Sequence, residues 1–525
     1  MDKQKSFDDD FEDKIMVLDY DSLAQIFMWL PVSQRIVMEN VCHKWKEACQ
    51  RSWYDITEYQ CGVSIDDDYQ SRLLTQSFVK KILLRCGVYL KELTLTEVCN
   101  SSMIISIVGE RCKNLTKLEL VFDETSRVNN NDYISTFTQL NKLVSIKIQK
   151  KNSKNFPDEI MNHLSEEINE IHLIFKYMSL KRPPIFFNLN KYKNLKSLTL
   201  RSCNLDDIIQ DISKKSTLVY LDIRRSWALE KTWIFNDLVN LEHIDLLHCC
   251  TIMEQNILNV FSSMIYTCKN LKHLEYSSHY NAPEPEIPLK YWLNLKNLVY
   301  LSTGWNMTED FAIKIVNYCK NLKDLTIKVQ STAAAIIKLT ELENLECLKI
   351  NYQELTKEEI IAISNNCKKL KHLEILYSKI KSCPFYLDLL SKLQYLEYLD
   401  LSGIKILQDS TIMMIADTHL KYLKIKGPNK LTEIGFNALT NLEHLQELTI
   451  DYNKTITNNF VEKVKGLRVL NCRGCTNLTD AGIIQVIKNC PDLERLDLSF
   501  IDNITLDTII AADLATKNQL HALEK

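Results

Sequence analysis

The hydrophobic positions of this chain recur in short runs of the form L-x-x-L-x-L, separated by longer stretches with helical spacing. Six copies show the form: CKNLTKLEL (112–120), YKNLKSLTL (192–200), CKNLKHLEY (268–276), CKNLKDLTI (319–327), CKKLKHLEI (367–375) and CPDLERLDL (490–498). The last two apolar residues of a run alternate with polar ones, so their side chains point to one face of a strand. Each run therefore predicts one short β-strand with one buried face.

The stretches between the runs have the spacing of amphipathic helices. In TDAGIIQVIKNC (479–490), Ile483, Val486, Ile487 and Cys490 fall at i, i+3, i+4 and i+7, and Thr479 is placed to cap the start. TEDFAIKIVNYC (308–319) and TKEEIIAISNNC (356–367) repeat this design. Because no such unit buries its own apolar face, the pattern predicts a stacked parallel α/β solenoid.

The period of the pattern indicates the kind of repeat. Successive units start 22 to 30 residues apart, with a mean of about 25, almost wholly within the leucine-rich-repeat range of roughly 20–29 residues. We expect about 17 repeats in a curved horseshoe over residues 89–510, with a C-terminal cap or tail at 511–525. The leading apolar residues are Leu90, Leu115, Leu143, Ile168, Leu195, Leu218, Leu241, Leu271, Leu298, Leu322, Leu345, Leu370, Leu396, Leu420, Leu445, Leu467 and Leu493.

Residues 17–54 follow a different pattern, which predicts a small all-helical domain. One helical stripe consists of Leu23, Ile26, Phe27 and Leu30, and Pro31 is expected to end that helix. A second stripe consists of Val37, Val41, Trp45 and Ala48. Helices in so short a piece bury little surface alone, so it needs a partner or a neighbouring domain. Residues 1–16 are predicted to be an acidic disordered tail, and 55–88 a linker and N-terminal cap that includes the first repeat helix.

Composition narrows the class of protein. The chain has 525 residues, with 64 Lys and Arg against 67 Asp and Glu, which disfavours nucleic acid or a membrane surface as the main partner. The N-terminus lacks the apolar core of a signal peptide, and no apolar run reaches the 18 residues of a membrane span. We therefore expect a cytoplasmic or nuclear protein, whose 17 cysteines are mostly free thiols.

Motifs for catalysis or cofactor binding are missing from the sequence. It contains no G-x-x-x-x-G-K-[ST], G-x-G-x-x-G or H-E-x-x-H. Two cysteine-containing stretches, HIDLLHCC (243–250) and the C-x-x-C of Cys472 and Cys475, resemble metal or redox motifs, but the repeat accounts for both. Cys472 takes the place of the last strand leucine, and Cys475 takes a turn position. We expect no cofactor, no bound metal and no catalytic residue.

The repeats resemble the cysteine-containing leucine-rich repeat, in which Cys ends the helix and Cys or Asn follows the last strand leucine by three residues. The first position is taken by Cys112, Cys268, Cys319, Cys367 and Cys490, and the second by Cys203, Cys249, Cys475, Asn306 and Asn453. Two units depart from the pattern, with Arg225-Ser226 and Gly427-Pro428 at the turn.

The N-terminal segment resembles an F-box. The order of Leu18, Asp21, Leu23, Ile26-Phe27, Leu30-Pro31, Val41-Cys42, Trp45 and Trp53 matches the family pattern, which has Pro, Asp and Leu where this chain has Asp19, Gln34 and Arg35. The resemblance implies a non-enzymatic substrate receptor of an SCF-type ubiquitin ligase. Its F-box would bind a Skp-type adaptor, and through it a cullin, while the repeats hold a protein for ubiquitination and degradation. The implied adaptor-binding and core residues are Leu18, Leu23, Ile26, Phe27, Leu30, Pro31, Val41, Cys42 and Trp45.

Two alternatives remain open from the sequence. The helical segment can be a cap that shields the end of the solenoid, and the repeats can be a protein-binding scaffold or inhibitor without a ubiquitin-ligase role. In either case the strand residues that packing does not require predict the binding face, where Tyr, Trp and Arg are favoured anchors. The predicted substrate-binding residues are Arg201, Tyr220, Arg224, Arg225, Trp227, Tyr300, Trp305, Tyr352, Tyr377, Tyr398, Tyr422 and Tyr452.

Overall fold

A computed structural model describes most of the chain. It covers residues 18–523 except 62–68, 97–98, 100, 123–128, 151–157, 177–184, 186, 228–234, 236, 250–261, 278–281, 284, 329–330, 352–353, 377–378, 381–383 and 428–429. The chain divides into two compact units, Met1–Asn240 and Leu241–Lys525, each described by itself below.

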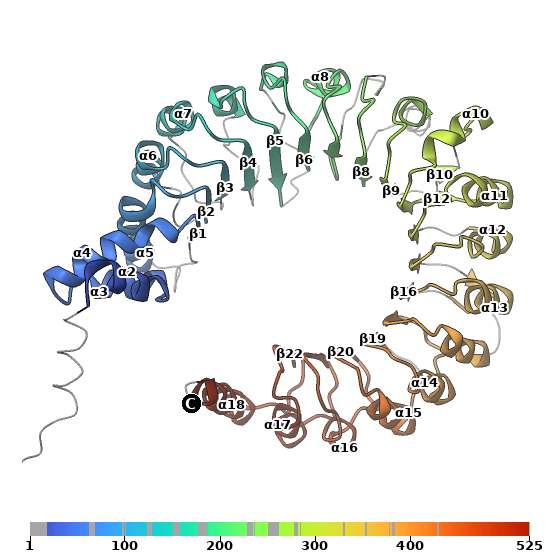
Figure 1. The fold of residues 1–525 in the computed structure, drawn as a ribbon. Helices are drawn as coiled ribbons and strands as arrows, with labels where there is room; N and C mark the ends of the chain where they lie inside the picture. The colour runs from blue at the N-terminus through green and yellow to red at the C-terminus, as the bar shows by residue number, and fades with distance from the viewer. Residues whose placement is uncertain are drawn as a thin grey trace, which may run out of the picture. The chain divides into compact units, whose positions relative to one another are not determined.

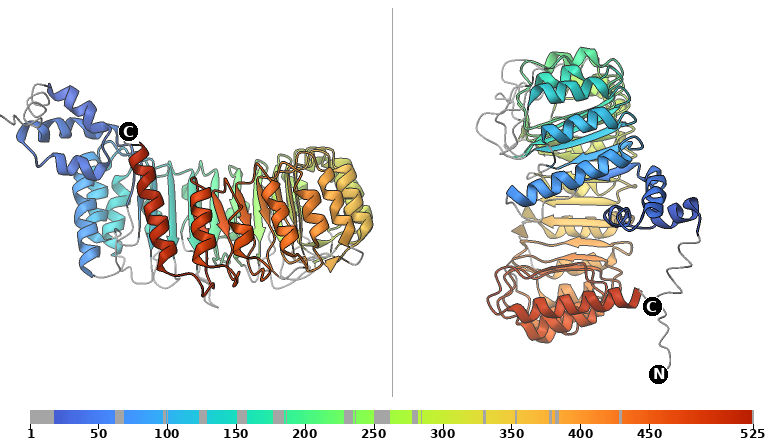
Figure 2. Two further views of the ribbon diagram at one scale, coloured as in Figure 1. Left: turned by 90° about the horizontal axis from the view of Figure 1, so that it is seen from below. Right: turned by 90° about the vertical axis from the view of Figure 1, so that its left-hand side faces the viewer.

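The first unit begins with a helical module, here residues 18–55. It contains α2 (Tyr20–Met28), α3 (Val32–Met38), α4 (His43–Ser52) and the 3₁₀ turn η1 (Trp53–Asp55). Asp19 begins α2 as its N-cap, since its carboxylate accepts a hydrogen bond from the backbone N–H of Ser22 at 2.7 Å. Helices α2 and α4 pack together around Leu23, Phe27, Ala48 and Cys49 (Figures 1 and 2).

The rest of the first unit alternates strands with helices or 3₁₀ turns. The strands are β1 (Glu58–Gln60), β2 (Glu92–Leu95), β3 (Lys117–Phe122), β4 (Ser145–Lys150), β5 (Glu170–Phe175), β6 (Ser197–Arg201) and β7 (Tyr220–Asp222). The helices and turns are α5 (Tyr69–Cys86), α6 (Ser102–Arg111), α7 (Asn130–Gln139), η3 (Asp158–His163), η4 (Leu189–Lys191) and α8 (Ile209–Ser213). The seven strands pair in chain order and in parallel.

The second unit repeats the arrangement. Its main sheet contains β8 (His243–Leu247), β9 (His273–Ser277), β11 (Tyr300–Thr303), β13 (Asp324–Ile327), β14 (Cys347–Asn351), β16 (His372–Leu376), β18 (Tyr398–Asp400), β19 (Tyr422–Lys424), β20 (Glu447–Thr449), β21 (Val469–Asn471) and β22 (Arg495–Asp497), all parallel. Two small pairs join β10 (Ala282–Pro283) to β12 (Trp305–Asn306) and β15 (Glu354–Leu355) to β17 (Lys379–Ile380).

The described helices and 3₁₀ turns of the second unit lie between successive strands, except α18, which follows the last strand. They are α10 (Leu289–Trp292), η5 (Leu293–Leu295), α11 (Glu309–Tyr318), α12 (Ala333–Leu339), α13 (Lys357–Asn366), η6 (Pro384–Lys392), α14 (Asp409–Ile415), α15 (Glu433–Ala438), η7 (Leu439–Asn441), α16 (Asn458–Val461), α17 (Asp480–Asn489) and α18 (Leu506–Leu523). In each unit the helices of the repeats lie on one side of the sheet, and we call the other side the open face (Figure 1).

The strand register confirms the predicted solenoid of strand and helix repeats. Every leading apolar residue predicted from the sequence is followed two positions later by the first residue of a strand, from Leu90 and β2 to Leu493 and β22. The central leucine or isoleucine of each strand pairs with that of the next, as Leu348 does with Leu325 and Leu373. These residues are almost fully buried except Leu496 in the last strand, so each unit's core is completed by its neighbours.

The helix ends follow the predicted cysteine pattern. Cys112, Cys319, Cys367 and Cys490 are the C-caps of α6, α11, α13 and α17, and each backbone N–H bonds the carbonyl four residues earlier. The predicted cap at Thr479 is right in position but wrong in contact, because its side chain makes no capping bond to α17. Its hydroxyl instead accepts a hydrogen bond from Asn458 Nδ2 at 2.7 Å.

Two features lie where the sequence predicted other structure. Strand β1 falls in the expected linker and extends the sheet by pairing with β2, and α18 runs through the expected boundary at residue 510. Cys61 and Cys99 form a disulfide, whereas 13 other described cysteines are thiols outside any disulfide, as expected for most of the cysteines. Among the described residues, no helix is long and apolar enough to cross a membrane.

Candidate protein-binding surfaces

The predicted adaptor-binding and core residues of the helical module fall into two groups, one buried and one exposed. Leu23 and Phe27 are buried in its core, and Leu18, Leu30 and Trp45 pack against that core. The ring of Trp45 lies 5.3 Å from that of Phe27. Cys42 is half-buried, and its Sγ accepts a hydrogen bond from the Trp45 backbone N–H, which caps α4. These residues hold the module together.

The second group is apolar and exposed to solvent. Ile26 is 48% exposed and Val41 is 56% exposed, and Pro31 is exposed as well. Two further exposed residues were not among the predicted adaptor-binding residues, Trp29 at 89% and Val37 at 58%. Val37 was predicted only as part of the second apolar stripe. We call these five residues, Ile26, Trp29, Pro31, Val37 and Val41, the apolar set. Exposed apolar side chains concentrated on so small a module are typical of a protein-binding site.

A buried arginine joins the ends of the module's helices. Arg35 is 2% exposed, and its guanidinium donates hydrogen bonds to the carbonyl oxygens of Met28, Leu30 and Ser52 at 2.6, 3.0 and 2.8 Å. It also forms a bidentate ion pair with Asp55, at 2.6 and 2.8 Å. Carbonyls at helix C-termini lack intrahelical partners, so Arg35 satisfies them where the F-box pattern has Leu.

A second polar contact attaches the module to the first repeat helix. Glu39 is 8% exposed and accepts hydrogen bonds from Trp53 Nε1 at 3.1 Å and from Arg85 Nε at 2.7 Å. Arg85 lies near the end of α5, and its second nitrogen also pairs with the Glu39 carboxylate. Bidentate pairing fixes direction as well as distance, so the contact sets how the module meets α5.

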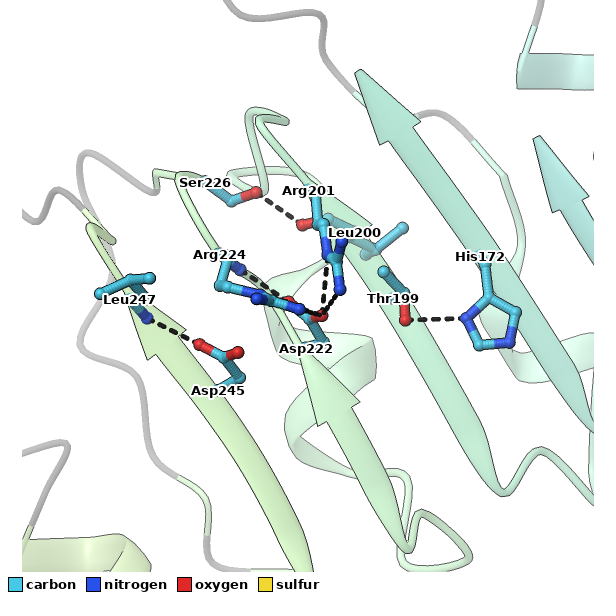
Figure 3. Close-up of polar contacts among 9 residues, drawn as sticks. All are labelled: His172, Thr199, Leu200, Arg201, Asp222, Arg224, Ser226, Asp245 and Leu247. Carbon is cyan, nitrogen blue, oxygen red and sulfur yellow. Dashed lines mark hydrogen bonds and ion pairs between the residues drawn. The ribbon is translucent and has the colours of Figure 1, made fainter. Parts of the chain in front are cut away.

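On the open face of the first unit, two arginines share one buried carboxylate (Figure 3). Asp222 is fully buried, and its Oδ2 lies 2.8 Å from both Arg201 Nε and Arg224 Nη2. Burial alone would raise the pKa of Asp222, but the hydrogen bonds from Arg224 and Arg201 outweigh it and lower the pKa. The result is an ionised carboxylate between two ordered guanidinium groups.

The other predicted residues of this face lie around that cluster. Tyr220 begins β7 and is half-buried, whereas Arg225 is exposed at the turn with a φ of 59°. Trp227 is half-buried and bridges to Asn204, so it packs along the turn. The sequence reading missed His172, whose Nδ1 lies 2.8 Å from Thr199 Oγ1. Burial lowers the pKa of His172, which favours its neutral form.

The open face of the second unit carries stacked rings. His243, His273 and Tyr300 stack with ring centroids 3.7 and 4.0 Å apart, and His372 stacks on Tyr398 at 3.8 Å. Tyr422 lies 6.0 Å beyond Tyr398. The tyrosines were predicted as substrate-binding residues, whereas the histidines, which occupy the same strand position, were not. Burial raises the pKa of Tyr300 to about 12, so its hydroxyl stays protonated.

A charged row runs beside these rings in the middle of the strands. Glu374 Oε1 lies 2.7 Å from His372 Nε2 and 2.9 Å from Lys349 Nζ. Burial would raise the pKa of Glu374, but those two contacts outweigh it and hold the pKa at about 2. Asp400, in the next strand, is 7% exposed, and burial raises its pKa. Two neighbouring carboxylates thus have opposite pKa shifts.

One predicted contact residue is placed wrongly, and two cannot be placed. Trp305 was predicted to lie on the open face, but it is 2% exposed and packs on Tyr276 and Phe311. The chain continues here as strand β12, so Trp305 points into the core and Asn306, the predicted turn residue, is exposed. Tyr352 and Tyr377 lie outside the described residues.

Both residues of the C-x-x-C motif lie in the core, as the repeat register predicts. Cys472 and Cys475 are fully buried, and their thiols donate to the carbonyls of Asp497 at 3.7 Å and Ile450 at 3.2 Å. Burial raises the pKa of both thiols, which disfavours the thiolate. Among the described residues, no group of three or more His, Cys, Asp or Glu is arranged to hold a metal ion.

Comparison with known proteins gives a partial likeness. No family model matches the chain. The F-box/TPR repeat protein pof3 of Schizosaccharomyces pombe is 24% identical over 196 residues, which cover 34% of this chain and 33% of that protein. The chain thus spans about a third of the length of this relative.

Three solved structures show similar folds. A leucine-rich-repeat protein of Leptospira interrogans has a TM-score of 0.44 at 21% identity, covering 83% of this chain and 96% of that one. The internalin inlF of Listeria monocytogenes has a TM-score of 0.40 at 14% identity, over 71% and 93%. A chain of the Rad7 and Elc1 complex in yeast has 0.37 at 21%, over 49% and 69%. Since these scores are below 0.5, the repeat fold of this chain rests on its own strand register.

Proposed function

We propose that this chain is a substrate receptor of a cullin-type ubiquitin ligase, with residues 17–54 as an F-box. The observation that carries the proposal is the apolar set of the helical module. Three members, Ile26, Pro31 and Val41, stand at positions of the F-box pattern, and all three side chains face solvent. The partial likeness to an F-box/TPR repeat protein supports the same assignment.

The proposed division of labour follows from the two kinds of surface. The module would bind a Skp-type adaptor through the apolar set, and through it a cullin. The open faces, with their rings and ordered arginines, would hold a target protein. The chain itself would catalyse no covalent step. It would act by holding the target close to a ubiquitin-charged enzyme, which raises the effective concentration of the reacting groups.

Co-purification with a Skp-type adaptor tests this proposal. The wild-type chain should retain the adaptor, and the exposed-site variant Ile26→Asp/Val41→Asp should lose it by a factor of at least about 100, since it places two charges in an apolar contact. Leu74→Asp is the matched control, because Leu74 is 72% exposed on α5, outside the module. A wild-type chain that does not bind the adaptor would refute the proposal.

The second candidate function is a protein-binding scaffold whose helical module caps the repeats. The Glu39–Arg85 contact favours it, since it fastens the module to α5. The same experiment separates the two. A cap without an adaptor would leave binding of the target intact and adaptor binding absent in the wild-type chain.

A further inference from the structure

The turn after eight of the described strands contains one residue with left-handed backbone geometry. Its position is constant, two residues after the last strand leucine or its equivalent. The residue that follows it is buried wherever the structure describes that residue. The φ values lie between 57° and 87°. The residues are Ser202, Arg225, His248, Gly403, Gly427, Tyr452, Gly474 and Phe500. Glycine adopts this geometry without steric cost, whereas a residue with a β-carbon does not.

In four consecutive repeats of the second unit, glycine and aromatic residues alternate at this position. The order is Gly427, Tyr452, Gly474 and Phe500. Tyr452 is 49% exposed and Phe500 is 64% exposed, so neither ring fills the core. Large apolar residues held in an unfavourable geometry with exposed rings point to a function for the side chains rather than for the turn.

The Tyr452 ring packs directly against Gly474. A β-carbon on Gly474 would lie 2.5 Å from Tyr452 Cδ1 and 2.8 Å from Tyr452 Cε1, closer than van der Waals contact allows. The ring therefore lies on the backbone of the next repeat. No such contact surrounds Gly427, where an added β-carbon would meet nothing within 4 Å.

Arg473 lies with its guanidinium over these rings. Its Cζ is 4.4 Å from the ring centroid of Phe500 and 6.0 Å from that of Tyr452. Its Nε is buried without a hydrogen-bond partner, and no carboxylate of the described residues forms an ion pair with it. The nearby Asp451 is paired with Lys426 at 3.2 Å, and Asp497 accepts from the Ser499 backbone N–H at 3.0 Å. Hydrogen bonds from Ser499 lower the pKa of Asp497, and the charge of Arg473 lowers it further. The guanidinium thus stacks on the rings and acts on Asp497 through its charge, but it forms no ion pair with a carboxylate among the described residues.

From this arrangement we infer that Tyr452, Arg473 and Phe500 form a binding site for an acidic segment of a partner protein. A carboxylate of the partner pairs with the Arg473 guanidinium, and an apolar side chain beside it lies on the Phe500 and Tyr452 rings. Charge complementarity selects this occupant, since an arginine stacked on aromatic rings is suited to planar, bidentate carboxylate contacts. The inference rests on the proposed role of the repeats in holding a target protein, and it is independent of the adaptor.

Fluorescence anisotropy on the full chain tests the site. The probe is a fluorescein-labelled eight-residue peptide of alternating Glu and Leu, and its twin carries Lys in place of Glu. We expect the Glu peptide to bind, the Lys peptide to bind at least tenfold more weakly, and Arg473→Gln to weaken binding of the Glu peptide at least tenfold. Arg468→Gln is the matched control, because Arg468 is exposed in the same unit and already paired with Glu494.

The outcomes decide between a site and diffuse attraction. Equal losses in Arg473→Gln and Arg468→Gln would refute the site, as would preferred binding of the Lys peptide. Dimers of the free chain that disappear in Arg473→Gln would show that a second copy occupies the surface, which would also refute it. Adaptor co-purification should be unchanged in Arg473→Gln, so failure of this site and failure of the proposed function are separate results.

A further variant distinguishes binding from packing. Phe500→Gly removes an exposed ring and places glycine where the backbone favours it. The midpoint of thermal unfolding should stay the same or rise, while affinity for the Glu peptide falls at least threefold. A lower midpoint together with unchanged affinity would mean that the ring serves the fold and would overturn the inference.

Discussion

The helical module and the repeats both have small cores, but they are stabilised by different kinds of contacts. In the repeats, strand leucines are almost fully buried at a fixed spacing, and each unit is completed by the next. The module is not a repeat, and the Glu39–Arg85 pair joins it to the first repeat helix. Its core is four buried residues, and two charged side chains, Arg35 and Glu39, are buried beside it.

This difference shows what a short helical module needs when its sequence does not repeat. Helix ends leave carbonyls without partners, and in the module these ends lie close together. Arg35 satisfies three of them and pairs with Asp55, which a leucine at the same place could not do. The module thus depends on one buried polar residue for contacts that no leucine could make.

The largest expected effect is therefore in the module. Arg35→Leu restores the residue common in the F-box pattern, yet it leaves three carbonyls and the Asp55 carboxylate without their partner. We expect the module to lose about 3–5 kcal/mol of stability, the range for breaking a buried ion pair. Hydrogen exchange of the α2–α4 amides measures this directly, with the repeat amides as internal control. Exchange in α2–α4 as slow as in the wild type would contradict it.

The sequence allowed the repeats to be predicted closely because the period is a local property. Each predicted leading residue stands two positions before a strand, and Cys472 and Cys475 are buried as predicted. The solenoid is specified by spacing that recurs in every unit, so one irregular unit does not obscure it. The same logic failed at Trp305, where the chain continues as β12 instead of turning.

The binding surfaces were less accessible to prediction, because they depend on contacts between units about 25 residues apart. Stacking of His243 on His273 requires two strands in register, and neither histidine is marked by its own neighbours in the sequence. Arg35 was noted as a departure from a pattern, whereas the structure shows it as the residue that joins the helix ends. Trp29 lies outside both predicted apolar stripes and was missed for that reason, whereas Val37 was placed in the second stripe but is exposed.

An intermediate effect is expected on the charged row of the open face. Glu374 has a folded pKa of about 2 against an ordinary 4.5, so its contribution to stability is present above pH 4.5 and is lost as the pH falls toward 2. Glu374→Gln should remove about 1–2 kcal/mol at pH 7, and the loss should vanish at low pH. Chemical unfolding of the second unit at several pH values measures it.

Asp400, in the same charged row, is a control because its pKa is shifted in the direction opposite to that of Glu374. Its folded pKa is raised by burial, so ionised Asp400 lowers stability at neutral pH, and the cost disappears as the pH falls below its ordinary 3.8. Asp400→Asn should therefore leave stability at pH 7 unchanged or raise it. If both variants lose stability with the same pH dependence, the assignment of separate charge states is wrong.

The smallest effect is expected at the C-x-x-C motif. Its two cysteines resemble a metal or redox motif, but the repeat register explains their positions. Cys472→Val keeps an apolar side chain of similar size and loses one long thiol contact to the Asp497 carbonyl. We expect a change in unfolding free energy below about 1.5 kcal/mol, whereas Leu470→Ala in the same strand should cost about 2–5 kcal/mol because it leaves a cavity. Thermal unfolding with and without a reducing agent or a metal chelator measures both. If Cys472→Val removed a dependence on chelator or reductant that the wild type shows, the thiols would have a chemical role rather than a packing role.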